Sequence, residues 1–309
     1  MTSNKMKVVA YLAAMPSPNK NPAKVEILER MIQGVVATGN NGILHRGSDL
    51  IDCDVAMIQG WSHEHGKRRA HLQLRESVYH HQHSQARRTL IVDSNLFNYR
   101  APVTPVTYHR YSFDGVFPTT GNYFNTAPDP QRWDLISQRT GITLKPWRSH
   151  GNHILICTQR NGGWSMQGLG VMDWLNQTIK TLRRHSQRPI VVRGHPGDKQ
   201  ATTYLTVRGS AWRLSRNVSI LDDFANAHAV ITYNSSPGVA AAIEGIPVFV
   251  TDPEPQHSQA AAVANTDLSQ IENPRMPDRQ AWIESIAMSH WSFDELSSGA
   301  AWQHFRQFV

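Results

Sequence analysis

The chain has 309 residues, of which 40% are hydrophobic and 18% are charged, so it can bury a sizeable core in two ordinary domains or one large one. Its longest apolar runs are far too short to cross a bilayer, and its charged N-terminus lacks the apolar core of a signal peptide. Cys53 and Cys157, the two cysteines, lie inside apolar segments, which favours buried thiols over a disulfide framework. We therefore expect a soluble, cytoplasmic protein.

Lysine and arginine number 31 against 24 acidic residues, which gives a formal charge of +7 and a pI near 9.6. This excess fits either a polyanionic partner or a merely basic protein. The cations concentrate in the first half of the chain, where a polyanion is expected to bind. They are Lys67, Arg68, Arg69, Arg75, Arg87, Arg88, Arg100 and Arg110.

Short β-rich segments alternate along the chain with longer helical patterns, which is typical of βαβ units and parallel sheets. Strands are predicted over residues 6–12, 54–60, 89–93, 153–158, 189–193, 218–221, 229–233 and 247–251. Helices are predicted over residues 22–37, 67–86, 171–185, 237–244, 277–290 and 294–307. A proline-rich segment, 98–151, interrupts the alternation and predicts a connector.

The predicted fold class is therefore α/β, with two doubly wound Rossmann-type domains that face a central cleft. The first covers residues 1–149, the second covers 150–285, and residues 286–309 form a C-terminal helix that packs back on the first. Ligands of such sheets bind outside the carboxyl ends of the strands. Chemically important residues are therefore expected directly after strands.

The loop after the strand 153–158 reads "TQRNGGWSMQGLG". Gly162 and Gly163 allow backbone N–H groups to approach a ligand, and Arg160, next to Asn161, adds a fixed positive charge. The loop is neither a Walker loop nor GxGxxG, so an ordinary connection explains it as well as a phosphate site does.

The next strand ends in "VVRGHPGD", which places Arg193 and His195 at the carboxyl edge, with Pro196 fixing the turn. The imidazole of His195 can donate to a phosphate oxygen and, if protonated, offset the charge of a leaving diphosphate. A turn histidine bonded to nearby backbone is the alternative.

The stretch "ITYNSSPGVAAAIEGIPVFV" joins a strand to a short helix. Ser235 or Ser236 suits the N-cap and Pro237 the first helical position. The same hydroxyls at a helix N-terminus can also hold a phosphate. Together with Arg193 and His195 one βα unit earlier, they predict a two-sided diphosphate clamp.

These two motifs, in this order on these elements, resemble the nucleotide-sugar domain of GT-B glycosyltransferases, especially the polysialyltransferase and capsule-polysaccharide transferase group with its His-Pro and Ser-Ser motifs. The resemblance covers residues 153–252. It implies that residues 150–285 bind a nucleotide-sugar donor, preferentially a UDP-sugar and without an obligatory metal, and that residues 1–149 bind the acceptor. It assigns the donor phosphates to His195, Ser235 and Ser236 beside Asn234, and places the loop of Arg160, Gly162 and Gly163 nearest the donor.

One departure concerns the ribose. Many GT-B enzymes carry a ribose-binding glutamate in the first turn of the helix that follows the serines, whereas here Glu244 stands at its far end. The nucleotide therefore stays open.

The chain also resembles bacteriophage proteins with a "QRNGGWSM" loop, and phage enzymes of this class commonly modify hydroxymethylated pyrimidines in DNA. The predicted acceptor is therefore such DNA, bound by the basic first half, with a polysaccharide or lipid-linked acceptor as the alternative. A non-catalytic nucleic-acid-binding protein is the second alternative. A flipped base would need aromatic neighbours, although most candidates should be core. They are Trp61, Tyr99, Tyr108, Tyr111, Phe113 and Phe117.

An inverting transferase needs a base that takes the proton of the acceptor hydroxyl. Asp93 ends the strand 89–93 and is the predicted base, with an Asx turn or helix cap as its structural alternative. Asp114 and Glu64 are the other candidates. The run His80-His81-Gln82-His83 is interpreted as part of a surface helix and not as a metal site, because adjacent histidines on a helix point in different directions.

Overall fold

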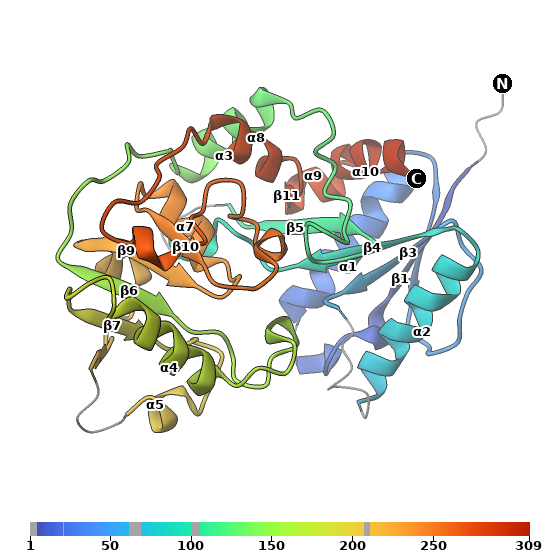
Figure 1. The fold of residues 1–309 in the computed structure, drawn as a ribbon. Coiled ribbons are helices and arrows are strands. Elements are labelled where there is room, and N and C mark those ends of the chain that lie inside the picture. Colours follow the sequence, from blue (N-terminus) through green and yellow to red (C-terminus); the bar gives the residue numbers. More distant parts are fainter. Residues whose placement is uncertain (1–4, 21, 62–68, 101–105, 207–210) are drawn as a thin grey trace. The chain divides into compact units, whose positions relative to one another are not determined.

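The computed structural model describes residues 5–20, 22–61, 69–100, 106–206 and 211–309, and the chain divides into two compact units (Figure 1). Unit 1 comprises Met1–Asn95, Pro105–Trp133 and Ser285–Val309, and unit 2 comprises Leu96–Thr104 and Asp134–Glu284. Residues 134–149, which the sequence analysis assigned to the first domain, therefore pack with unit 2. The segment 96–104 also belongs to unit 2.

The sheet of unit 1 has the strand order β11-β5-β4-β3-β1-β2. Strands β2, β1, β3 and β4 run parallel, β5 is antiparallel to β4, and β11 is antiparallel to β5. The strands are β1 (Lys7–Tyr11), β2 (Asn41–His45), β3 (Val55–Gln59), β4 (Arg88–Asp93), β5 (Tyr108–Phe113) and β11 (His290–Ser292).

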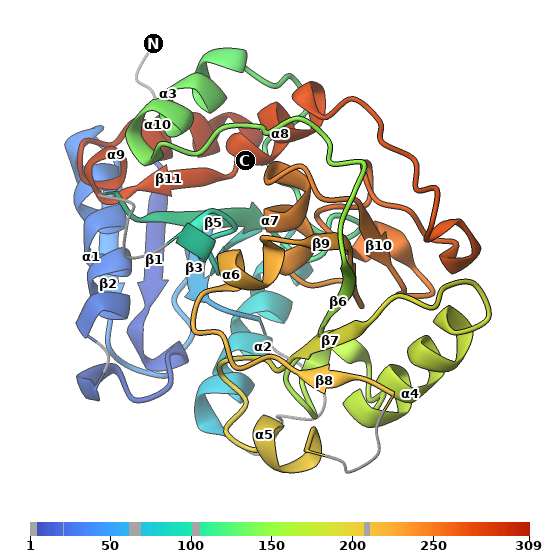
Figure 2. The same ribbon diagram turned by 90° about the vertical axis from the view of Figure 1, so that its left-hand side faces the viewer.

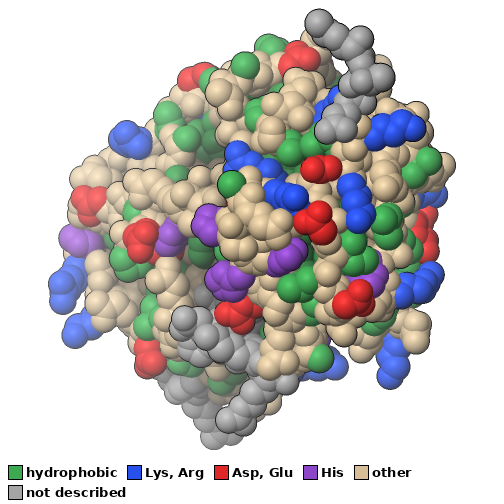
Figure 3. Space-filling model, turned by 90° about the vertical axis from the view of Figure 1, so that its right-hand side faces the viewer, with side chains coloured by type: hydrophobic (Ala, Val, Ile, Leu, Met, Phe, Trp, Pro, Cys, Tyr) green, Lys and Arg blue, Asp and Glu red, His purple; other side chains and the backbone are tan. Residues whose placement is uncertain are grey.

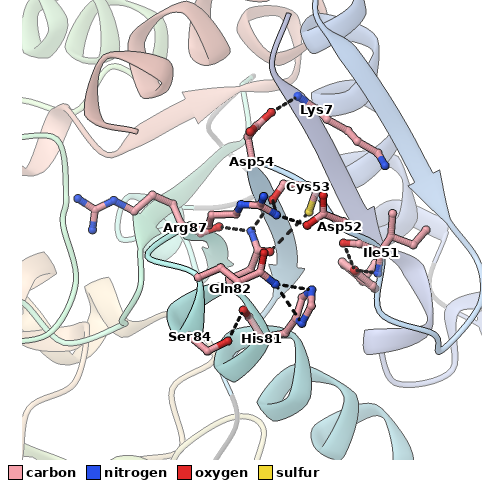
Figure 4. Close-up of polar contacts among 12 residues, drawn as sticks. Lys7, Ile51, Asp52, Cys53, Asp54, His81, Gln82, Ser84 and Arg87 are labelled. Carbon is pink, nitrogen blue, oxygen red and sulfur yellow. Dashed lines mark hydrogen bonds and ion pairs between the residues drawn. The ribbon is translucent and has the colours of Figure 1, made fainter.

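Helices α1 (Pro22–Ala37) and α2 (Ala70–Ser84) of unit 1 cover opposite faces of its sheet (Figure 1). Helices α9 (Phe293–Ser297) and α10 (Ala300–Phe305) pack against α1, and their apolar residues share one core with β1, β3 and β4. Helix α2 turns Gln82 inward, where its amide donates to the carbonyl oxygens of Cys53 and Arg88 (Figure 4). The histidines of α2 do not share the buried side of Gln82, and His80 and His83 are exposed.

The sheet of unit 2 is fully parallel, with the order β10-β9-β6-β7-β8. Helices α4 (Val171–Leu182) and α7 (Pro237–Ile243) lie on opposite faces of it (Figure 2). The strand order reverses between β6 and β9, so the crevice at the carboxyl ends of these two strands is the topological switch point where open α/β sheets bind ligands. The strands are β6 (His153–Cys157), β7 (Ile190–Arg193), β8 (Arg213–Leu214), β9 (Ala227–Thr232) and β10 (Val248–Val250).

The remaining helices are short or join the units. They are α3 (Pro130–Thr140), α5 (Ala201–Tyr204), α6 (Ile220–Phe224) and α8 (Gln280–Ala287). No helix in the described part of the chain is long and apolar enough to span a membrane.

Besides elements that were not predicted, such as β2 and β5, some predicted elements differ from the structure. Residues 218–221 do not form a strand: Ser219 accepts a hydrogen bond from the Leu221 N–H at 3.1 Å and begins helix α6, so its capping hydroxyl outweighs the β-branched neighbours. The predicted helices 277–290 and 294–307 are interrupted by strand β11 and by Gly299, whose φ of 86° is left-handed.

Candidate functional site

Three loops meet at the switch point of unit 2, after β6, β7 and β9. The Asn161 N–H donates to Oδ2 of Asp198 at 2.9 Å, which joins the loop after β6 to the loop after β7. The Asn234 N–H donates to Oε1 of Gln159 at 3.1 Å, which joins the turn after β9 to the loop after β6. Most of the residues predicted for donor binding lie in these loops.

His195 presents a neutral imidazole with a defined tautomer. The Gly197 N–H donates to its Nδ1 at 3.0 Å, so the proton of the neutral ring is on Nε2. Burial and the nearby Arg160 guanidinium lower the pKa of His195, while Asp198 acts in the opposite direction. Nε2 has no partner among the described residues and is therefore a hydrogen-bond donor for a ligand.

Arg160 supplies the positive charge at this edge. It is exposed, and none of the described residues forms an ion pair with its guanidinium. Its guanidinium lies near the imidazole of His195, since both groups border Gly197. A Cβ atom added to this glycine would be 2.4 Å from Nη2 of Arg160 and 3.1 Å from Cε1 of His195. A cation next to a neutral N–H donor is a suitable arrangement for phosphate oxygens.

Neither Ser235 nor Ser236 caps helix α7. Ser236 stands at the N-cap position with helical dihedrals, φ −56° and ψ −27°, whereas a capping side chain requires an extended backbone there. Its hydroxyl is exposed and makes no described hydrogen bond. The Ser235 hydroxyl is buried and has no partner in the described part of the chain, which costs about 1–3 kcal/mol until a hydrogen-bond partner is supplied. Both hydroxyls are therefore unused by the fold.

Arg193 does not fit its predicted role as a phosphate ligand, because its guanidinium already has partners within the protein. It pairs with the buried carboxylate of Asp223 at 2.5 Å and donates to the carbonyl oxygens of Asn217 at 3.0 Å and Val218 at 2.8 Å. The side chain thus ties the loop after β8 to the end of β7, and the buried Asp223 carboxylate already compensates the positive charge that a phosphate would need.

The glycine pair forms a turn. Gly162 has a φ of 69°, and the Gly163 N–H donates to the Arg160 carbonyl oxygen at 2.9 Å, so this N–H is not available for a ligand. Asn161 is also engaged, since its Oδ1 accepts the Val171 N–H at the start of α4. These residues shape the loop that presents Arg160.

Asn234 is likewise engaged. Its Nδ2 donates to Oδ2 of Asp252 at 2.7 Å and to the Ser165 carbonyl oxygen at 3.1 Å, which uses both amide hydrogens. The remaining Oδ1 is an acceptor, as phosphate oxygens are, and would not bind them.

Sequence reasoning missed Asp198, Gln159, Asp252 and His257. Asp198 accepts from Asn161, Gln200 and the Tyr204 hydroxyl; burial would raise its pKa, but these donors lower it. Asp252 follows strand β10 directly, so the rule that placed His195 and Asn234 at the carboxyl edge would have found it.

In unit 1, Asp93 lies at the carboxyl end of β4. Its Oδ2 forms an ion pair with the buried Arg110, its neighbour in the strand register, and its Oδ1 has no partner among the described residues. Arg75 lies near enough to sense the Asp93 charge, although its described hydrogen bonds go to the carbonyl oxygens of Ala14 and Trp61. One carboxylate oxygen is therefore available to accept a proton.

The alternative bases fare differently. Asp114 follows β5, which is antiparallel to β4, so it lies at the amino end of β4, where it accepts from the Thr89 N–H at 2.8 Å and pairs with Arg88 at 2.7 Å. Asp114 thus lies beside Thr89, which is four residues before Asp93 along β4, a distance of about 13 Å. Glu64 lies outside the described residues, so its role stays a prediction.

The cations predicted to meet a polyanion mostly have internal partners. The described pairs are Arg87 with Asp52, Arg88 with Asp114, Arg100 with Glu244 and Arg110 with Asp93. Lys67 and Arg68 lie outside the described residues, and Arg69 is exposed. On the face drawn in Figure 3, basic and acidic side chains alternate without a continuous basic patch. A cation whose charge is compensated by a neighbouring carboxylate contributes little to the binding of phosphates.

Most of the aromatic residues considered for base recognition are core, as expected. Tyr108, Tyr111 and Phe113 are fully buried. Tyr99 donates its hydroxyl to Glu244 at 3.0 Å, in unit 2. Within the described ranges, no group of three or more histidine, cysteine, aspartate or glutamate side chains could hold a metal ion.

No protein-family model matches the sequence, and no curated protein matches it either. Among solved structures, the chain is similar to a beta Kdo 2,4 transferase, KpsC of Thermosulfurimonas dismutans, with a TM-score of 0.60 and 11% identity over 96% of this chain and 99% of that one. It is also similar to the beta Kdo 2,7 transferase of the same KpsC, with a TM-score of 0.51 and 14% identity over 96% and 99% of the two chains. At these identities the likeness establishes the fold, which is GT-B-like as predicted.

Proposed function

We propose that the protein is a glycosyltransferase that uses a nucleotide-sugar donor, with the donor phosphates bound at the switch point of unit 2. The observation that carries this proposal is the pair formed by Arg160 and His195, to which the turn of Ser235 and Ser236 is joined through Asn234 and Gln159; among the described residues, the guanidinium of Arg160, Nε2 of His195 and both hydroxyls have no partner. This set differs from the sequence prediction, since Arg193, Asn161 and Asn234 support the loops.

Arg160 and His195 would stabilise the leaving group. As the bond from the anomeric carbon to the diphosphate oxygen breaks, the electron pair and negative charge move onto that oxygen. The Nε2–H of His195 would donate to a phosphate oxygen and the Arg160 guanidinium would supply the charge, so protonation of the histidine is unnecessary. Ser235 would have to rotate about χ1, because its Oγ is inaccessible in the described conformation.

Asp93 is the proposed base for transfer with inversion. Its Oδ1 would take the proton of the acceptor hydroxyl while the acceptor oxygen forms the bond to the anomeric carbon. The ion pair with Arg110 would fix the orientation of the carboxylate.

We propose a saccharide acceptor in preference to hydroxymethylated DNA. Two solved structures that share this fold at a TM-score above 0.5 are Kdo transferases, and the described cations expected to hold DNA are largely paired. The UDP-sugar prediction stays open, because the unit lacks an acidic residue early in α7 that would hold a ribose.

The test is incubation with a panel of UDP-, GDP- and CMP-sugars and acceptors that include acidic and neutral oligosaccharides and hydroxymethylcytosine DNA, followed by mass spectrometry of the products. We expect sugar transfer to an oligosaccharide. Transfer to DNA alone would overturn the acceptor assignment, and salt-dependent DNA binding without any effect of a nucleotide sugar would favour the non-catalytic alternative.

Two variants test the residue roles. Replacement of His195 by alanine should abolish donor binding, whereas His185→Ala, an exposed histidine at the end of α4, should bind donor normally. Asp93→Asn should bind donor and fail to transfer. Donor hydrolysis at the wild-type rate by His195→Ala would refute the phosphate assignment.

A further inference from the structure

The loop after β10 holds a carboxylate that accepts a hydrogen bond from the Asn234 amide and fixes its orientation. Asp252 follows β10, and its side chain is only 1% exposed. Its Oδ2 accepts from the Asn234 amide at 2.7 Å, and its Oδ1 accepts from the Glu254 N–H at 3.0 Å. A buried carboxylate with several donors is held in one position.

His257 contacts the same carboxylate oxygen, Oδ2, that accepts from Asn234. Nδ1 of His257 lies 3.2 Å from Oδ2 of Asp252, and Nε2 lies 3.2 Å from Oε2 of Glu254. A continuous set of polar contacts therefore runs from the exposed Glu254 through the buried pair to Asn234.

Asn234 passes this constraint to the loop after β6. Its Nδ2 also donates to the Ser165 carbonyl oxygen at 3.1 Å, and its N–H donates to Gln159 at 3.1 Å. Nε2 of Gln159 in turn donates to Oγ of Ser165 at 2.6 Å. The loop that carries Arg160 and the turn that carries the serines are thus bonded to each other through Asn234.

We propose that Asp252, supported by His257, is a positioning residue of the donor-phosphate site. Asp252 is too deeply buried to contact a ligand, so it acts through Asn234 and sets the spacing between Arg160 and the Ser235–Ser236 turn. Only the identity of the ligand rests on the proposed function. The positioning follows from the contacts within unit 2. Misplacement of a binding group by about 1 Å can reduce activity by about 100-fold.

The test compares Asp252→Ala with Asp252→Asn, which keeps the size of the side chain and one acceptor oxygen. In Asp252→Ala, amide hydrogen exchange should accelerate in peptides that cover residues 159–166 and 232–236 as well as 252–257. The dissociation constants for UDP and CMP, measured by calorimetry, should rise by about tenfold to 100-fold, and less in Asp252→Asn. His257→Gln, which keeps an N–H donor, should retain more affinity than His257→Ala.

Asp267→Asn is the matched control, because Asp267 caps a short helix elsewhere in unit 2 through Ser269 and contacts none of these loops. It should leave nucleotide affinity and exchange unchanged. Wild-type affinity in Asp252→Ala, or faster exchange confined to residues 252–257, would overturn the positioning role. If the wild-type protein binds none of these nucleotides, the proposed function fails, and the exchange pattern alone still decides whether Asp252 couples the two loops.

Discussion

Acidification should destabilise unit 1 because two of its histidines are buried in the neutral form. His290 on β11 is fully buried, and burial, with Arg110 and Arg132 nearby, lowers its pKa to about 3, although the Ile286 carbonyl oxygen acts against the shift. Burial lowers the pKa of His109 on the adjacent β5 to about 4, and its Nε2 is buried without a described partner. In the folded unit, neither ring therefore takes up a second proton until the pH falls to about 4 or below.

The size of the effect follows from proton linkage. An unfolded histidine takes up a proton as the pH falls through its ordinary value of 6.5, whereas these folded histidines do not until about pH 4 and pH 3. Their contribution is fully present above pH 6.5 and falls by about 1.4 kcal/mol per pH unit for each group below it. At pH 5 the two together should lower the free energy of unfolding by about 4 kcal/mol. This is a large part of the usual total of about 5–15 kcal/mol.

Urea unfolding, followed by tryptophan fluorescence at pH 7 and pH 5, measures this difference. His109→Phe is the informative variant, because it removes one titrating ring that lacks a described hydrogen bond and keeps an aromatic contact with Phe293. It should lose about 2 kcal/mol less than the wild type between these pH values. The buried carboxylates interfere little, since their lowered pKa values act only below about pH 4.5. Equal stability of the wild type at both pH values would refute the reasoning.

Three further predictions concern stability and reactivity. Ala86 ends α2 in a left-handed conformation, φ 54°, so Ala86→Gly should raise the free energy of unfolding by about 1 kcal/mol in the same titration, and a loss would contradict the strain argument. Glu244→Gln should lower it by about 3 kcal/mol, because it removes the buried charge that pairs with Arg100, and an unchanged midpoint would refute this. Burial raises the pKa of Cys53 to about 11 and that of Cys157 to about 12, so a thiol reagent should label them only after unfolding, and rapid native labelling would disprove their inertness.

The parallel part of the fold was predictable because strong periodicity and local signals agree there. Helix α1 has the predicted bounds, Pro22–Ala37, and β9 (Ala227–Thr232) differs from the predicted strand 229–233 only at its ends. Strand β5 (Tyr108–Phe113) was missed because it lies in a proline-rich segment and most of its pairing is with distant residues, 90–93 and 290–292. Such pairing depends on tertiary contacts, which local β-propensity does not predict.

The location of the candidate site was predictable to the level of loops. A polar residue directly after a parallel strand lies at the carboxyl edge, and this rule placed His195, Asn234 and Asp93 correctly on their elements. The rule does not state whether such a side chain has internal partners. Arg193 and Arg160 look equivalent in sequence, yet Asp223 occupies the first and none of the described residues pairs with the second.

The same distinction decides what the basic composition means. A formal charge of +7 describes the sum of the charges, whereas binding to a polyanion depends on cations whose charge is not already compensated nearby. In the described part of unit 1, Arg110, Arg88 and Arg87 each have an aspartate partner, so the excess does not gather into a DNA-binding surface there. Arg160 in unit 2 has no such partner among the described residues and lies beside the neutral imidazole of His195, whose Nε2–H has no partner there either. A small phosphate-bearing ligand fits that combination better than a long polyanion does, and this is the physical reason for placing the donor site at the switch point.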